Sequence, residues 1–212
     1  MYASRADLPS AQRAAELLVA ELAARPDAFD AAWKLARVSY WLGGHLPQND
    51  RRAALERGLA AGETASRLQP SRPEGHFWTA ANMGALAESF GLRAGLKYRK
   101  PVREKLETVL RIAPAFQDGS ADRALGRWYF RVPSLFGGSD KKAEAHLRAS
   151  LTYDDESTLS RLFLAELLLE QDRKAEARTE LQRVLDAPAN PAWIPEDREN
   201  KDRARALLEK IR

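Results

Sequence analysis

The chain of 212 residues contains no cysteine and only three histidines. Without cysteine it has no disulfide framework, thiol nucleophile or cysteine-bound metal, although this absence fits cytoplasm and periplasm equally. No uncharged apolar run reaches the length of a membrane-spanning helix. β-branched residues are also scarce, whereas alanine, leucine, glutamate and arginine are common, and this composition favours helix over strand.

Motifs of the common enzyme classes are missing as well. The sequence has no GxxxxGK[ST], GxGxxG, HExxH or GxSxG pattern. His76 with nearby Glu74 is a candidate for metal binding or acid–base chemistry, but the favoured interpretation is a histidine that packs against a neighbouring helix with its polar edge hydrogen-bonded. The sequence therefore predicts no enzyme, no cofactor and no metal site.

The charge balance is mild. The 34 basic and 30 acidic residues give a formal net charge of +4, which permits an acidic partner but does not require nucleic acid or a membrane. The first residues, MYASRADLPS, lack the long apolar core of a secretory signal. We therefore expect either a cytoplasmic protein or a mature chain from which a leader or lipid anchor has been removed.

A repeat is the clearest pattern that the sequence does contain. Pro26, Pro70 and Pro114 stand 44 residues apart, and Ala14, Gly58 and Val102 share that spacing. Later in the chain the period is 34 residues, and these positions recur: Ala143, Leu147 and Ser150 as Ala177, Leu181 and Val184. A fixed period of this length is typical of stacked helical repeats. One template with inserted loops at about residues 43–52, 90–97 and 135–139 explains both periods.

The expected fold is all-α: a right-handed solenoid of helix–turn–helix repeats similar to tetratricopeptide repeats (TPRs), with about ten helices. Gly43-Gly44 is expected to end the second helix, Gly91 to Gly95 to form a break, and Pro101 to lie near the first turn of the next helix. Gly58 and Gly62 indicate a close helix crossing. A single domain over residues 1–212 is expected, with these parts: a cap helix at 9–24, repeats at about 27–70, 73–114, 119–155 and 158–189, and a final cap helix at 196–211.

Several segments resemble known families. Leu125, Gly126 and Tyr129 match the Leu-Gly-x-x-Tyr part of the TPR pattern. The segments WKLARVSYWLG (33–43), EGHFWTAANMG (74–84), KPVREKLETVLRIAP (100–114) and the stretch at 118–150 resemble the T component associated with tripartite ATP-independent periplasmic (TRAP) transporters. A more distant likeness, through LGRWYF and LFGGS, is to the eukaryotic regulators of microtubule dynamics.

The TRAP resemblance implies a periplasmic, exported or lipid-anchored protein that associates with the solute-binding P component. It also implies trimers with a pore or cleft for apolar ligands. The chain departs from that family in showing no leader and no lipid-bearing cysteine.

In TPR stacks one face of each first helix lines a concave groove. The same helix offset predicts these partner-binding residues: Lys34, Trp41, Phe77, Arg123, Arg127 and Phe130. Aromatic and cationic side chains together suit a peptide, a carboxylate-bearing ligand or an amphipathic segment. In the last repeat the groove positions hold Leu159, Leu162 and Leu169, an apolar stripe that either the final helix or another subunit must cover.

Two charged runs have structural and functional interpretations. Asp154-Asp155-Glu156 is best explained as a turn leading into a helix, because it lacks the ligand spacing of a cation site. The strongest basic run contains Lys97, Arg99, Lys100, Arg103 and Lys105. It is interpreted first as a solvated helix face, and otherwise as an anchor for an acidic partner, a lipid headgroup or nucleic acid; nucleic acid is disfavoured because acids balance the basic residues elsewhere.

The leading functional hypothesis is a non-enzymatic scaffold whose concave groove binds a protein, by resemblance a periplasmic solute-binding protein of a TRAP transporter. The alternatives are an oligomeric carrier or pore for apolar ligands and a general cytoplasmic TPR adaptor. An enzyme would require a deep cleft where His76 meets a carboxylate. A homo-oligomer is possible under each of these hypotheses.

Overall fold

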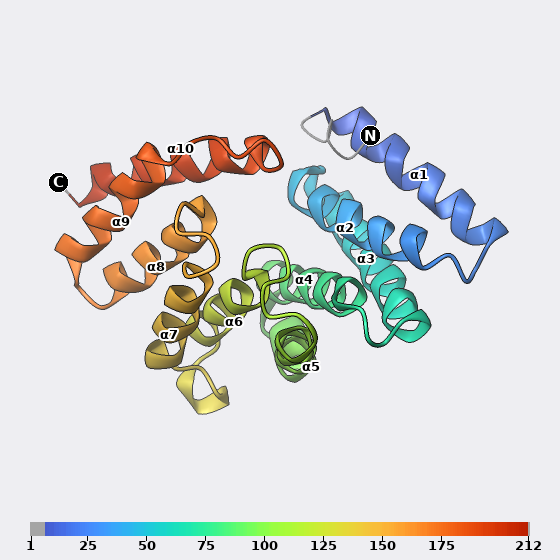
Figure 1. Cartoon of the computed structure of the whole chain (residues 1–212), viewed down its shortest axis with the longest axis horizontal. Coiled ribbons are helices and arrows are strands. Elements are labelled where there is room, and N and C mark those ends of the chain that lie inside the picture. Colours follow the sequence, from blue (N-terminus) through green and yellow to red (C-terminus); the bar gives the residue numbers. More distant parts are fainter. Residues whose placement is uncertain (1–6, 212) are drawn as a thin grey trace. The chain divides into compact units, whose positions relative to one another are not determined.

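The computed structural model describes residues 7–211, which fold entirely into helices and turns with no strand. Ten α-helices and one short 3₁₀ helix follow one another along this part of the chain (Figure 1). They are α1 (Leu8–Ala24), α2 (Phe29–His45), α3 (Gln48–Leu68), α4 (Pro73–Ser89), α5 (Gly91–Ile112), α6 (Ser120–Arg131), η2 (Ser134–Phe136), α7 (Asp140–Ser150), α8 (Thr158–Glu170), α9 (Lys174–Asp186) and α10 (Ile194–Lys210).

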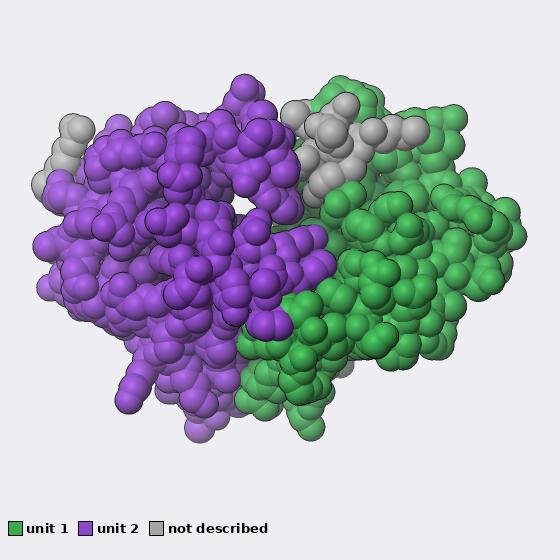
Figure 2. All heavy atoms as spheres, in the orientation of Figure 1, with its two compact units in different colours: residues 1–113 green, residues 114–212 purple. Residues whose placement is uncertain are grey.

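The chain divides into two compact units, Met1–Ala113 and Pro114–Arg212 (Figure 2). In unit 1, α2 packs against α3 and α4 against α5, while α3 and α4 join the two hairpins and α1 packs on α2. In unit 2 the hairpins are α6 with α7 and α8 with α9, and α10 packs on both α8 and α9. The expected single domain over residues 1–212 stays a prediction.

Small residues allow the helices of unit 1 to approach closely. A Cβ atom on Gly62 of α3 would lie 2.9 Å from the backbone nitrogen of Thr79 on α4, closer than packed atoms can come. The prediction that Gly58 and Gly62 mark a close crossing is therefore confirmed. The close approach lets leucines on either side, such as Leu55 and Leu86, become fully buried.

In unit 2 the final helix covers Leu162, the middle residue of the apolar stripe predicted on α8. Leu162 has no exposed surface and packs in a cluster with Leu181, Val184 and Ala204. Thr158 reinforces the contact, because its hydroxyl donates to Asp197 at 2.7 Å and accepts from Asn200 at 3.0 Å, both on α10. The expected cover by the final helix is thus confirmed for Leu162, whereas Leu159 and Leu169 are partly exposed and their cover stays a prediction.

Of the predicted break points in unit 1, the one at Gly43-Gly44 is wrong and the one at Gly91 to Gly95 is shorter than expected. Gly43 and Gly44 lie inside α2, because neither takes a left-handed backbone and Gly43 packs against Leu55. The break before α5 is confined to Phe90 and Gly91, where Gly91 has a φ of 81°. Pro101 consequently lies deep inside α5 and not in its first turn, a position that costs about 3 kcal/mol in an ordinary helix.

These corrections change how the 44-residue period is explained. The extra residues expected as loops at 43–52 and 90–97 mostly lengthen helices, so that α3 has 21 residues and α5 has 22. The insertion expected at 135–139 lies in the loop between α6 and α7, which also contains the 3₁₀ helix η2.

Candidate functional site

The first helix of each hairpin has one buried small residue. This residue marks which side of the helix is packed, and it therefore fixes which nearby residues share the adjacent face of that helix. The small residues are Ala36, Ala80, Gly126 and Ala165. On each of these helices, the residues three before, one after and four after the small residue form what we call the first-helix stripe of its unit. Its members are Trp33, Arg37 and Tyr40 on α2; Phe77, Ala81 and Gly84 on α4; Arg123, Arg127 and Phe130 on α6; and Leu162, Glu166 and Leu169 on α8.

On α2 the stripe combines aromatic and cationic side chains. The Arg37 guanidinium lies over the Trp33 ring, 4.9 Å from its centroid. Trp33 Nε1 donates a hydrogen bond of 3.0 Å to Asp30, which fixes the indole on the helix surface. Tyr40 is 42% exposed, and its ring lies 5.8 Å from that of Trp78 on α4. The helix thus presents two partly exposed aromatic rings with a cation between them.

Lys34 lies beside this stripe. Its Nζ is 3.5 Å from Asp30 Oδ2 and 5.5 Å from the Trp33 ring centroid. The hydrogen bond from Trp33, followed by the charge of Lys34, lowers the pKa of the Asp30 carboxyl below its ordinary value. Asp30 therefore stays ionised and holds both Trp33 and Lys34, so Lys34 is a neighbour of the stripe rather than its centre.

Trp41 and Phe77, also predicted as binding residues, are mostly buried. Trp41 is 6% exposed and stacks on His45 with 3.8 Å between centroids. Phe77 is 8% exposed and meets Trp78 edge-on at 5.0 Å. Both side chains pack inside unit 1, and their part in binding stays a prediction.

Sequence reasoning missed Trp33, Arg37 and Tyr40 through a shift of one residue on α2. The offset that gives Arg123, Arg127 and Phe130 from Gly126 gives these three residues when it is counted from Ala36. The sequence did contain the signal for the correct residues, because the small residue Ala36 marks the position from which the offset must be counted.

In unit 2 the stripe is engaged by its own chain. Arg127 on α6 donates to Glu166 on α8 at 2.6 Å and lies over the Phe163 ring at 4.7 Å. Arg203 on α10 also donates to Glu166. Arg123 and Phe130 are partly buried on the same helix. Arg127 is therefore already paired with a carboxylate, and whether it and its neighbours bind a partner stays a prediction.

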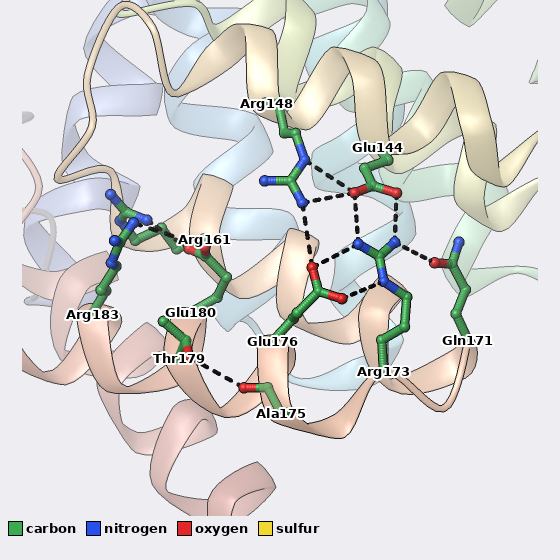
Figure 3. A network of polar contacts seen from close by, with 10 residues as sticks. All are labelled: Glu144, Arg148, Arg161, Gln171, Arg173, Ala175, Glu176, Thr179, Glu180 and Arg183. Carbon is green, nitrogen blue, oxygen red and sulfur yellow. Dashed lines mark hydrogen bonds and ion pairs between the residues drawn. The ribbon is translucent and has the colours of Figure 1, made fainter.

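A network of charged side chains joins the second helices of unit 2 (Figure 3). Glu144 on α7 accepts hydrogen bonds of 2.7 Å from both Arg148 and Arg173, and Arg173 also donates to Glu176 at 2.7 Å. Hydrogen bonds from Arg173 are the main cause that lowers the pKa values of Glu144 and Glu176. The network connects α7 with the start of α9.

A second, more buried pair lies beside it. Arg161 on α8 donates to Glu180 on α9 at 2.6 Å and to the backbone oxygen of Asp155 at 2.7 Å. Their side chains are 9% and 11% exposed. The acidic run at 154–156 forms the turn before α8, as expected, and the Asp154 carboxylate accepts a hydrogen bond of 3.1 Å from the Glu156 backbone nitrogen. The run does not start the helix, which begins only at Thr158.

An open depression of about 270 Å³ lies next to this pair, lined by Arg148, Leu151, Thr152, Arg161, Glu180 and Arg183. Each of its three arginines lies beside a carboxylate: Arg161 bonds Glu180, Arg148 bonds Glu144 outside the depression, and Arg183 lies 3.9 Å from Glu180. We interpret the cluster as the electrostatic connection between α7, α8 and α9.

His76 packs as the sequence predicted. It is 8% exposed, and its Nε2 lies 2.9 Å from the Pro70 carbonyl oxygen. Glu74 pairs instead with Arg72. Burial lowers the pKa of His76 from its ordinary 6.5, with a further contribution from Lys105, whose Nζ is 3.5 Å from Nδ1. Over residues 7–211 no group of three or more acidic or histidine side chains is placed to hold a metal ion.

This buried histidine gives a pH prediction. Because the pKa of His76 is lower in the folded chain than in the unfolded one, only the unfolded state takes up a proton just below pH 6.5. The free energy of unfolding should fall between about pH 7.5 and about pH 5.5, and less steeply in His76→Gln. Urea titrations of both proteins at the two pH values measure the difference; equal slopes would contradict the assignment.

Comparisons with known proteins agree with this architecture. Residues 141–194 match the family model of the tetratricopeptide repeat. A thermophilic TPR protein from Thermus thermophilus has a similar structure, with a TM-score of 0.73, 23% identity, and coverage of 98% of this chain and 95% of that one. The chain is thus a TPR-like helical repeat protein, and the predicted all-α repeat fold is confirmed.

A more specific family covers most of the sequence. Residues 4–145 match the model described as regulator of microtubule dynamics protein 1-3, and the chain belongs to this family. The likeness through LGRWYF and LFGGS is therefore confirmed. No curated protein matches the chain in sequence. The narrower relation to the TRAP T component stays a prediction.

Proposed function

We propose that the protein is a non-enzymatic scaffold that binds a segment of another protein along the first-helix stripe of unit 1. One observation carries the proposal: Trp33, Arg37 and Tyr40 lie on one face of α2, where Tyr40 is exposed, Trp33 and Arg37 are partly buried, and Trp33 is fixed by its bond to Asp30. Side chains of these three types dominate protein–protein binding energy, because they combine large apolar area with a polar group. The TPR-like fold is one that typically serves as a binding scaffold.

The neighbouring helix suits the same role. The stripe positions on α4 include Ala81 and Gly84, neither of them buried, and α4 packs beside α2. Small side chains there leave room for the backbone of an incoming segment. Arg37 and Lys34 favour a carboxylate in that segment, and Tyr40 and Trp33 favour an apolar or aromatic side chain. The proposed ligand is therefore an acidic segment with one or more apolar residues.

Two partners are consistent with this chemistry. The resemblance to the TRAP T component supports a periplasmic solute-binding protein, which would place the chain in the periplasm. The family description, regulator of microtubule dynamics, supports a microtubule component as the second candidate. An apolar-ligand carrier is less favoured, because buried leucines, such as Leu42 and Leu55 in unit 1 and Leu164 and Leu168 in unit 2, fill the cores of both units.

Selection from a displayed peptide library tests the proposal. Wild-type protein should retain acidic peptides with an apolar residue, and Arg37→Glu with Tyr40→Ala should weaken their binding about tenfold or more. Arg67→Glu is the matched control, since Arg67 is exposed on α3 outside the stripe. Peptides that bind the stripe variant and wild type equally would exclude this surface.

Partner identity needs separate experiments. Co-sedimentation with polymerised tubulin tests the microtubule candidate, and a pull-down with a purified TRAP solute-binding protein tests the periplasmic one. In either case the stripe variant should lose binding while its circular dichroism spectrum stays that of wild type.

A further inference from the structure

The first turns of α5 are not required by the packing of unit 1. Residues 91–97 include no buried side chain, whereas later in the helix Tyr98, Val102, Leu106 and Val109 are buried. Leu92 is 76% exposed and Leu96 is 43% exposed. These turns therefore leave two leucines in solvent.

Cations lie beside these leucines on the same side of the helix. Leu92, Leu96 and Lys100 follow one another at four-residue spacing and form one row, and Arg93 and Lys97 form the next row. All three cationic side chains are exposed, Lys100 at 72%. Tyr98, Val102 and Leu106 form a separate row about a third of a turn away that faces the core. An apolar row therefore borders a cationic row on the outer surface.

Charge is concentrated in this segment. Residues 91–105 contain six basic residues and one acidic residue, Glu104, for a net charge of +5, so the rest of the chain has a net charge of −1. Glu104 lies 3.6 Å from Lys100, and both side chains are more than half exposed, which leaves the pair strongly screened. The excess of the whole protein's positive charge thus resides on this helix.

We propose that residues 91–100 of α5 dock on an anionic lipid bilayer, with Leu92 and Leu96 inserted at the interface and Arg93, Lys97 and Lys100 on lipid phosphates. An apolar row bordered by cations is the pattern of helices that lie in the membrane interface. An anionic surface attracts each such cation by about 1 kcal/mol. A protein partner is less well matched, because leucine is under-represented among binding hot spots and lysine is depleted at protein interfaces.

Docking of this kind places the helix on the membrane without crossing it. Over residues 7–211 no helix has the length and apolarity needed to span a bilayer. The proposal is independent of the first-helix stripe, since it uses another helix and other side chains.

Vesicle co-sedimentation tests the proposal. Wild type should bind phosphatidylcholine vesicles that contain phosphatidylserine and not vesicles of phosphatidylcholine alone. Leu92→Ser with Leu96→Ser, and separately Lys97→Glu with Lys100→Glu, should each weaken binding about tenfold or more. Leu17→Ser with Val19→Ser is the control, because these α1 side chains are also exposed apolar residues, at 39% and 42%, and binding should be unchanged.

Insertion itself can be measured with a fluorophore. The chain has no cysteine, so Leu92→Cys provides a single labelling site, with Leu17→Cys as the matched control. An environment-sensitive label at residue 92 should shift to the blue on anionic vesicles, and one at residue 17 should not.

Three results would overturn the proposal. The first is failure of wild type to bind anionic vesicles. The second is loss of binding in the lysine variant alone with no shift at residue 92, which would mean charge attraction without insertion. The third is binding of polyglutamate in place of vesicles, which would identify an acidic protein as the partner.

Discussion

Gly62→Ala is expected to destabilise unit 1 by roughly 1–3 kcal/mol, the usual cost of overpacking a tight interface. The added methyl group would meet the backbone of Thr79, whose nitrogen would lie at 2.9 Å and whose Cα would lie at 3.0 Å. A backbone cannot move aside as a flexible side chain does, so α3 and α4 must separate. Urea unfolding followed by circular dichroism measures the loss.

The matched control is Gly44→Ala. Gly44 is also inside a helix, but a Cβ atom there would meet nothing within 4 Å. Alanine should therefore stabilise the protein by up to about 1 kcal/mol through its higher helix propensity. If both alanine variants changed the free energy of unfolding in the same direction, the close crossing of α3 and α4 would be refuted.

Glu180→Ala is expected to destabilise unit 2 by roughly 3–5 kcal/mol. The change removes the carboxylate that Arg161 contacts at 2.6 Å and leaves a guanidinium that is 9% exposed without its main counter-charge. Burying an uncompensated charge costs far more than losing an exposed ion pair. The measurement is the free energy of unfolding from urea titration.

Removing both charges separates this explanation from simple loss of packing. Arg161→Met with Glu180→Leu should recover most of the stability, because no buried charge is left without a partner. Asp202→Ala, which breaks an exposed pair with Arg205, should change the free energy of unfolding by less than about 1 kcal/mol. A double variant as unstable as Glu180→Ala would contradict the explanation.

Much of the fold could be predicted from the sequence, because a repeat reports its own register. The shared positions of Ala143 and Ala177, and of Leu147 and Leu181, are all fully buried, as equivalent places in a repeated packing unit must be. Helix starts carry a sequence signal where a side chain caps the backbone. Asp7 accepts a hydrogen bond from the Ser10 backbone nitrogen, and Ser139 accepts one from that of Lys142.

The errors occurred where local preference and tertiary packing disagree. Glycine usually marks a helix end. Gly43, however, lies inside α2, and its lack of a side chain leaves room for the Leu55 side chain of α3. Proline is disfavoured inside a helix, yet α5 runs from Gly91 past Pro101 without interruption. Single-residue patterns cannot separate these cases, because the deciding contact comes from another helix.

The candidate site was less predictable for the same reason. Aromatic side chains on α2 recur on several faces, and only burial separates Trp41, which packs inward at 6% exposure, from Tyr40, which is 42% exposed. Arg127 fits the predicted face, but its pairing with Glu166 depends on a helix 39 residues further along the chain. The sequence could indicate which residue types a binding face would use, but not which of them pack against their own chain.

The most direct test of the scaffold function is a charge exchange at Arg37, measured by isothermal titration calorimetry with an acidic peptide from the library selection and its lysine-substituted counterpart. Wild type should bind the acidic peptide and not the lysine version, and Arg37→Glu should reverse this preference while its circular dichroism spectrum is unchanged. If Arg37→Glu kept wild-type affinity for the acidic peptide, α2 would not be the face that binds the partner.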